Sequence, residues 1–122
     1  MHELTLLFGV AENVERVIQA NGIDHVDAVV LDVGEATTVV PAFLEDGYSV
    51  VSDEYDFLRG SKLIIHVVKA VGRCRVCGEE YPIVENKGIC PNCGSFDKEV
   101  IAGQDFIIRE VRVLETEMNE TK

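Results

Sequence analysis

Residues 74–94 read CRVCGEEYPIVENKGICPNCG, and they separate two kinds of sequence along the chain. The stretch carries all four cysteines, as two CxxCG motifs with twelve residues between the two CxxC pairs. From Gly72 to Gly103 the apolar periodicity weakens, and Gly, Pro and Asn become frequent. A segment of this size cannot bury a sufficient hydrophobic core, so it needs a cross-link. The sequence therefore predicts a small module that is held together by its cysteines and inserted into a larger domain.

The four thiols, Cys74, Cys77, Cys90 and Cys93, match the closed tetrahedral ligand set of a structural zinc site. Each CxxC pair presents its thiolates from one tight turn, and the glycine after each pair permits the backbone to fold back beneath the sulfur atoms. Two disulfides are the alternative, but cysteines in the cytoplasm are kept reduced. We therefore expect one tetrahedral metal ion, without an open coordination position for catalysis.

The identity of that metal has two interpretations. CxxCG followed by CPxCG also resembles the iron-binding loops of rubredoxins, which carry a longer and more aromatic segment between the pairs. Here Tyr81 is the only aromatic residue between the pairs, and the chain has no Trp. We therefore expect zinc, and a rubredoxin-like electron carrier with iron is the less favoured alternative.

Outside the insert, the apolar pattern predicts helices and strands. The first helix covers Glu3 to about Ala20, and Asn21-Gly22 ends it. Pro41 fits the first turn of the second helix, where its missing N–H costs nothing. Runs rich in Val and Ile predict strands at His25–Val33, Lys62–Val71 and Gln104–Leu114.

Helical spacing also predicts which side chains face the core. In the first helix this face contains Leu7, Val10, Val14, Val17 and Ile18. In the second helix it contains Phe43, Leu44, Tyr48, Val51 and Tyr55. Gly47 lies in the middle of the second helix and weakens the helical pattern there.

Together these elements predict an α+β fold, an α/β sandwich in which two helices cover a small three-stranded sheet. A four-cysteine, zinc-ribbon-like module is inserted before the last strand. The predicted division assigns residues 1–71 to the first part of a nickel-binding α/β domain and 72–103 to the zinc module. Residues 104–122 form the last strand and a flexible tail, ETEMNETK.

Composition excludes several classes of function. Of 122 residues, 22 are acidic and 11 are basic, which gives a formal net charge of −11. Such a surface repels phosphate backbones, so we expect no nucleic-acid binding. No apolar run is long enough to span a bilayer and no signal peptide is recognisable, so we expect a cytoplasmic protein that binds no membrane.

An acidic cluster lies in and after the second helix. Its members are Glu45, Asp46, Asp53, Glu54 and Asp56. We interpret the cluster as a solvated helix face, with a docking surface for a basic protein partner as the alternative.

The chain begins MHELTL, which places an imidazole one residue from the terminal amine. The amine and the His2 amide nitrogen close a five-membered ring on a metal, and His2 Nδ1 closes a six-membered ring with the same amide. Three nitrogens in one plane suit Ni(II) or Cu(II) rather than Zn(II). From these residues alone, a solvent-facing histidine without a metal is the simpler interpretation.

Three features occur here in one order: MHELTL, then LDVGEATTVVPAFLEDGYSVV at residues 31–51, then CxxCG with CPxCGS before a terminal strand. From Met1 to about Val113 this combination resembles the HypA/HybF family of hydrogenase-maturation nickel metallochaperones. The resemblance implies a nickel site at Met1, His2 and Glu3 and structural zinc at the four cysteines. It also implies that Ni²⁺ is delivered to the large subunit of [NiFe]-hydrogenase, with the nickel-handling GTPase HypB as a partner.

Other polar residues are given simpler interpretations. We expect His25 at an exposed element end, and His66 as a partly buried, hydrogen-bonded side chain within a strand. Asp32 and Glu35 are interpreted as surface carboxylates, with an oxygen ligand for nickel as the alternative.

No pattern in the sequence predicts an enzyme. A nucleophile with its base, a phosphate-binding glycine loop and an HExxH motif are all missing from the sequence. We therefore expect no catalytic residues. A zinc-stapled interaction or regulatory module without a nickel role is the alternative function, and a homodimer is one assembly that the sequence leaves open.

Overall fold

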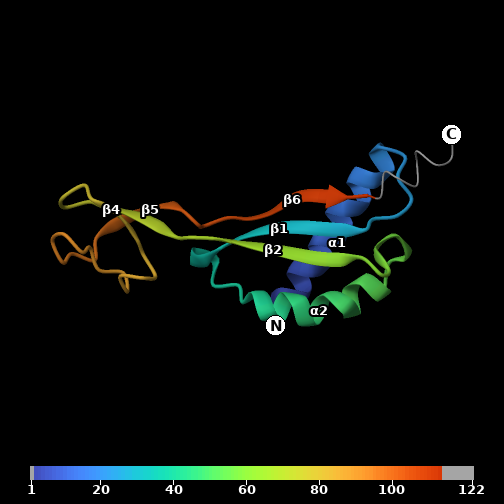
Figure 1. Ribbon diagram of the computed structural model, residues 1–122, viewed down its shortest axis with the longest axis horizontal. Coiled ribbons are helices and arrows are strands. Elements are labelled where there is room, and N and C mark those ends of the chain that lie inside the picture. The colour runs from blue at the N-terminus through green and yellow to red at the C-terminus, as the bar shows by residue number, and fades with distance from the viewer. Residues whose placement is uncertain (1, 114–122) are drawn as a thin grey trace. The chain divides into compact units, whose positions relative to one another are not determined.

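The computed structural model describes residues 2–113, with the side chain of His2 excepted. Its elements in chain order (Figure 1) are α1 (His2–Ala20), β1 (Ala28–Gly34), α2 (Pro41–Asp53), β2 (Lys62–Val68), β3 (Val71–Cys74), β4 (Glu80–Pro82), β5 (Lys98–Ala102) and β6 (Phe106–Arg112), with short 3₁₀ helices at Glu35–Thr37 and Asp56–Leu58. The strands form two three-stranded sheets, in the orders β2-β1-β6 and β4-β3-β5. The predicted α+β fold with an inserted cysteine module is confirmed.

Contacts divide the chain into two compact units. The first contains Met1–Leu31, Val40–Ile65 and Ile108–Lys122, and the second contains Asp32–Val39 and His66–Ile107. The sequence-based division at residues 72 and 103 stays a prediction. Among the residues from 2 to 113, no helix combines the length and the apolar character that crossing a bilayer requires.

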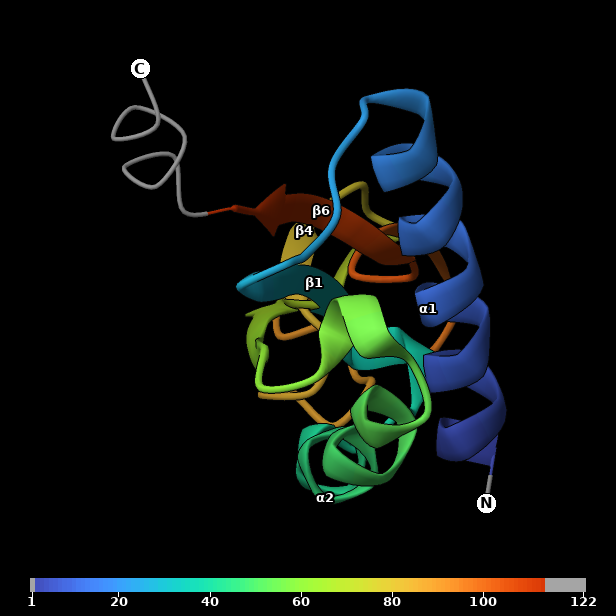
Figure 2. The ribbon, with the colours of Figure 1, turned by 90° about the vertical axis from the view of Figure 1, so that its right-hand side faces the viewer.

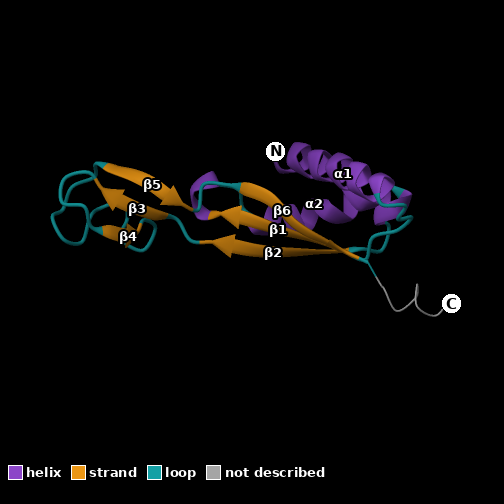
Figure 3. Cartoon of the chain, turned by 90° about the horizontal axis from the view of Figure 1, so that it is seen from above, coloured by secondary structure: helices purple, strands orange, loops and turns teal. Residues whose placement is uncertain are grey.

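The core of the first unit lies between the helices and one face of the sheet, because α1 and α2 cover the same side (Figure 3). In α1, four of the predicted core residues are buried, and Ala11 is buried beside them. The four are Leu7, Val10, Val14 and Ile18. Val17 is 48% exposed, so its predicted burial is wrong. It lies at the edge of the apolar stripe of α1, where a helical side chain is only half covered.

Helix α2 begins at Pro41, as predicted, and buries Leu44, Tyr48 and Val51. Phe43 is 54% exposed, so its predicted place in the core is wrong. The helix buries the side that contains Leu44 and Val51, and Phe43 precedes Leu44 by one residue, which is a rotation of about 100° away. The second helix therefore carries a large apolar side chain on its outer surface.

Tyr55 was also predicted on the core face of α2, but α2 ends at Asp53. The Tyr55 ring instead joins an aromatic cluster, with its centroid 6.4 Å from that of Phe8 and 5.4 Å from that of Phe57. Tilted rings at these separations stabilise one another beyond their buried area.

Gly47, which weakened the helical pattern of the sequence, lies against α1, and Figure 2 shows the two helices side by side. A Cβ atom built on Gly47 would lie 3.1 Å from a methyl carbon of Leu4 and 3.1 Å from one of Leu7. The missing side chain therefore lets the first two turns of α1 pack directly on the backbone of α2. The cost of glycine in a helix interior is offset by this contact.

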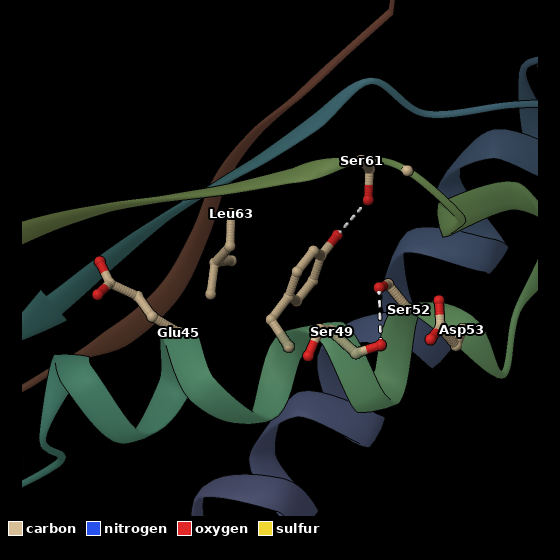
Figure 4. Close-up of a pocket in the computed structure, with 8 residues that line it drawn as sticks. Glu45, Ser49, Ser52, Asp53, Ser61 and Leu63 are labelled. Atoms are coloured by element: carbon tan, nitrogen blue, oxygen red, sulfur yellow. Dashed lines mark hydrogen bonds between the residues drawn. The ribbon is translucent and has the colours of Figure 1, made fainter.

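Tyr48 connects α2 to the start of β2 (Figure 4). Its hydroxyl lies 2.6 Å from Ser61 Oγ, which donates in turn to the Leu58 carbonyl oxygen. Burial raises the pKa of Tyr48. The bond crosses an open hollow of about 370 Å³, with Glu45 and Asp53 at its two ends. The hydroxyl groups are thus satisfied by one another, and the bond fixes α2 against the sheet.

The second unit contains a sheet that the sequence did not predict. Strand β3 pairs antiparallel with β4 and with β5, with Gly72 opposite Tyr81 and Cys74 opposite Lys98. The strands have only three to five residues. Because they carry no apolar alternation, hydrophobic periodicity cannot detect them.

A backbone-on-backbone contact lies where β1 ends, within the second unit. A Cβ atom on Gly34 would lie 2.1 Å from the carbonyl oxygen of Gly103, and one on Gly103 would lie 2.5 Å from Cα of Ala70. The Gly34 N–H donates to the Asp105 oxygen, and the Ala36 N–H donates to the Gly103 oxygen, each at 2.8 Å. Only glycine permits the segments to approach so closely.

Replacing Gly34 by Ala is expected to lower the free energy of unfolding by about 2–3 kcal/mol or more, because the new methyl group meets immovable backbone. Thermal or urea unfolding of the variant measures this change. Gly9→Ala is the matched control, since nothing lies within 4 Å of the new Cβ and the position is inside α1. That control is expected to gain about 0.5–1 kcal/mol. A Gly34→Ala protein as stable as the wild type would contradict the contact.

Candidate metal centre

The structure brings the four cysteines of the insert together. Cys74 ends β3, Cys77 lies in the turn that follows, and Cys90 and Cys93 lie in the turn before β5. Their sulfur atoms all lie within 4.8 Å of one another. The Sγ atoms of Cys74 and Cys93 are 3.5 Å apart, and those of Cys77 and Cys90 are 3.6 Å apart.

These distances fit a metal ion better than disulfides. A disulfide holds its sulfur atoms about 2.05 Å apart, and all four cysteines are free thiols here. Sulfur atoms bound at about 2.3 Å to a tetrahedral zinc ion lie about 3.8 Å from one another. The cysteines therefore match a closed tetrathiolate site, in which every coordination position is taken by protein.

Each CxxCG motif folds as the same hydrogen-bonded turn. The Gly78 N–H donates to the Cys74 oxygen at 2.9 Å, and the Gly94 N–H donates to the Cys90 oxygen at 2.8 Å. Both glycines have a positive φ, of 83° and 81°, which non-glycine residues rarely adopt. The local sequence thus aims two thiols from each turn at one point, as the CxxCG spacing predicts.

Beneath the sulfur atoms lies a very small core. Tyr81 is 2% exposed and is buried with Cys74 and Cys90, and Ile83 packs against this group. Burial and then the neighbouring thiolates, Cys90 first, raise the pKa of Tyr81, which keeps the phenol neutral. Because the cysteines themselves form half of the core, the fold of the module depends on what holds them together.

Without a metal the thiols differ strongly in acidity. A hydrogen bond from the Asn92 side chain is the main cause that lowers the pKa of Cys77 to about 6. The backbone N–H of Cys77 is the main cause that lowers the pKa of Cys74. The pKa of Cys93 is raised to about 12, because its bond to Cys74 and burial outweigh the lowering effect of the Ser95 N–H. The site therefore holds negative charge and at least one proton, which a divalent cation displaces on binding.

The other predicted site lies at the start of α1. Met1 lies outside the described residues, as does the His2 side chain. Helix α1 begins at His2, so the first backbone N–H groups of the helix have no carbonyl partner within it. The pKa of Glu3 is lowered, first by a hydrogen bond with the terminal amino group and then by backbone N–H groups, including that of Val40. An ionised carboxylate is therefore present at this helix end.

Other residues that the sequence suggested have structural roles. Glu35 Oε1 accepts the Ala70 N–H at 2.8 Å, a contact between residues 35 positions apart that local patterns cannot indicate. His25 lies at an exposed end, as expected, with Nε2 2.9 Å from the Arg59 oxygen. His66 is exposed, so the prediction of partial burial is wrong. It lies on β2, an outer strand of its sheet, whose residues from His66 onward are uncovered.

Comparison with known proteins gives a consistent result. The family model described as "Hydrogenase/urease nickel incorporation, metallochaperone, hypA" matches residues 1–113. Hydrogenase maturation factor HypA of Geotalea uraniireducens (strain Rf4) is 34% identical over 113 residues, which covers 93% of this chain and 99% of the relative. The protein of the same name from Acidithiobacillus ferrooxidans (strain ATCC 53993 / BNL-5-31) is also 34% identical, with the same coverage.

Solved structures share the fold. The solution structure of the Ni metallochaperone HypA from Helicobacter pylori has a TM-score of 0.68 and 19% identity, and the match covers 93% of this chain and 98% of that one. A second solution structure of a HypA protein also has a TM-score of 0.68, at 18% identity, over 93% and 97% of the two chains. The resemblance read from the sequence is confirmed, and the chain belongs to the HypA family of hydrogenase maturation factors, which are nickel metallochaperones.

Proposed function

We propose that this chain carries Ni(II) at Met1, His2 and Glu3 and delivers it for the maturation of [NiFe]-hydrogenase. The observation that carries the proposal is the start of α1 at His2, where amide nitrogens without helical partners lie beside the ionised carboxylate of Glu3. Nickel is the cargo in this scheme rather than a resident cofactor. The hydrogenase large subunit is the acceptor, and the GTPase HypB is the partner in delivery.

The electrostatics of a helix start restrict which ligands can hold a cation there. The positive end of the helix dipole disfavours a cation by about 0.3–1 kcal/mol. A deprotonated amide nitrogen and the Glu3 carboxylate offset this cost with negative charge. Only metals that favour planar nitrogen coordination deprotonate an amide readily, so this ligand set selects Ni(II) or Cu(II) over zinc and magnesium.

The four cysteines serve a separate purpose in the proposal. We assign them one structural Zn²⁺, because four thiolates close the coordination shell and stabilise a module with almost no core. We expect no catalytic activity of the chain, and we expect it to act in the cytoplasm. Neither role requires nucleic acid or a membrane.

Nickel binding is expected to require both His2 and an unextended amino terminus. Untagged protein should bind one equivalent of Ni(II) with the visible absorption of a square-planar complex, as titration by calorimetry and absorbance will measure. His2→Ala should lose this site. A protein with two residues added before Met1 should lose it as well, because the amine is then displaced from the chelate.

The same site is expected to release nickel when the pH falls through the range in which histidine titrates, about 7 to 5, since protons compete for the imidazole and the amine. Zinc should stay bound over most of that range. Equal nickel binding by wild type and His2→Ala, or retention of nickel at the lower pH, would contradict the proposal and favour a zinc-stapled interaction module.

Zinc occupancy is expected to decide whether the module folds. Purified protein should contain one zinc per chain and be colourless, whereas an iron tetrathiolate would be red. Cys90→Ser should lose zinc and expose Tyr81 to solvent, which near-ultraviolet circular dichroism detects. Zinc binding should release protons, including the one that Cys93 holds, so that affinity rises with pH.

Val76→Ser is the matched control for the cysteine variant. Val76 lies between Cys74 and Cys77, yet its side chain is 66% exposed. This variant should keep one zinc ion and an unchanged Tyr81 signal. If Cys90→Ser retained both, the cysteines would not hold the module together.

A further inference from the structure

An exposed apolar stripe lies along the side of α2 that borders α1, and it includes a residue of the first turn of α1. The stripe consists of Val40, Phe43 and Val50 with Leu4, and their exposed fractions are 41%, 54%, 55% and 42%. Single exposed apolar residues need no explanation, but a contiguous group of them marks an interaction surface.

The spacing of the stripe makes it one continuous surface. Val40, Phe43, Gly47 and Val50 follow one another at intervals of three, four and three residues, which places them on one side of a helix. Leu4 lies against this line from α1, because its methyl carbon would be 3.1 Å from a Cβ atom on Gly47. Leu4, in the first turn of α1, therefore completes the stripe at the position where α2 lacks a side chain.

The charge around the stripe identifies the kind of partner. The sequence contains no Lys or Arg between Arg16 and Arg59, so α2 has no basic side chain. Asp46, beside the stripe, and Glu54, one turn beyond Val50, are exposed. Within the described part of the chain, neither carboxylate has an ion-pair partner, whereas Asp56 is paired with Arg59.

We propose that the stripe is a docking surface for an amphipathic helix of a protein partner, with apolar residues at heptad spacing and basic residues beside them. Intervals of three, four and three residues, here from the N-cap Val40 to Val50 of α2, are the pattern that a facing helix fills. The unpaired carboxylates favour basic flanking residues, which add specificity and speed of association. A second copy of this chain fits poorly, since it would bring the same carboxylates together.

The docking surface adjoins the nickel ligands along the chain. Leu4 belongs to the stripe and directly follows Glu3. A partner helix bound to the stripe would therefore lie next to the proposed nickel site, where side chains of the partner could replace the nickel ligands of this chain. This last step rests on the proposed nickel site, but docking itself does not.

A peptide-binding measurement tests the proposal. The probe is a fluorescent synthetic helix of about three heptads, with Leu at positions a and d and Lys elsewhere. Binding is measured by the fluorescence anisotropy of this peptide at about 0.15 M salt. Wild-type protein should bind it, and should not bind the same peptide with Glu in place of Lys. The double variant Phe43→Ser, Val50→Ser should weaken binding at least about tenfold, because two apolar contacts are lost.

Two controls separate the stripe from general attraction to an acidic protein. Val17→Ser removes an apolar residue of α1 that is 48% exposed but lies outside the stripe, and it should bind the peptide like wild type. His2→Ala should also bind normally, so failure of the nickel site and failure of docking give different results. Thermal unfolding of every variant verifies that it is folded.

Three results would overturn the proposal. The first is binding of the basic peptide that is equal in wild type and in the stripe variant, which would show attraction by charge alone. The second is equal weakening by Val17→Ser. The third is a dimer of wild-type protein in analytical ultracentrifugation that the stripe variant abolishes, because a second copy would then be the occupant.

Discussion

In the proposed function, the attraction of four thiolates for one cation is the interaction on which the second unit depends. The buried cluster beside the sulfur atoms contains Tyr81 and two of the cysteines, and the strands around it are short. The pKa of Cys93 is raised to about 12, although the Ser95 N–H lowers it, because the hydrogen bond to Cys74 and burial outweigh that effect, whereas the pKa values of Cys74 and Cys77 are lowered. The energy of metal binding is thus part of the folding energy of this unit.

In the proposed function, the chain keeps two metal-binding chemistries apart by ligand type. Thiolates from two hydrogen-bonded turns would form a closed shell, which releases its ion slowly and suits a structural role. Nitrogen ligands at the amino terminus would form an open shell that a partner can reach and that protons weaken. The acidic residues of α2 support this proposal, since they attract a partner that carries basic residues.

Local patterns predicted much of this molecule. The CxxCG spacing determines both hydrogen-bonded turns, so the cysteine cluster could be read from the sequence, and Pro41 correctly marked the start of α2. The predictions that were wrong concern features that depend on residues distant in the sequence. Phe43 and Val17 fit an apolar helical pattern, but the extent of burial depends on what covers the helix. The hydrogen bond between Glu35 and Ala70 forms only when separate segments of the chain meet. The same holds for the close backbone approach of Gly34 to Gly103.

X-ray absorption spectroscopy of untagged protein loaded with one nickel and one zinc tests the central claim most directly, because it reads both ligand shells in one sample. The account predicts a nickel edge with a planar shell of nitrogen and oxygen donors and no sulfur. It predicts a zinc edge with four sulfur neighbours at about 2.3 Å. Sulfur in the nickel shell, or nitrogen and oxygen in place of sulfur around zinc, would contradict the division of the two metals between the amino terminus and the cysteines.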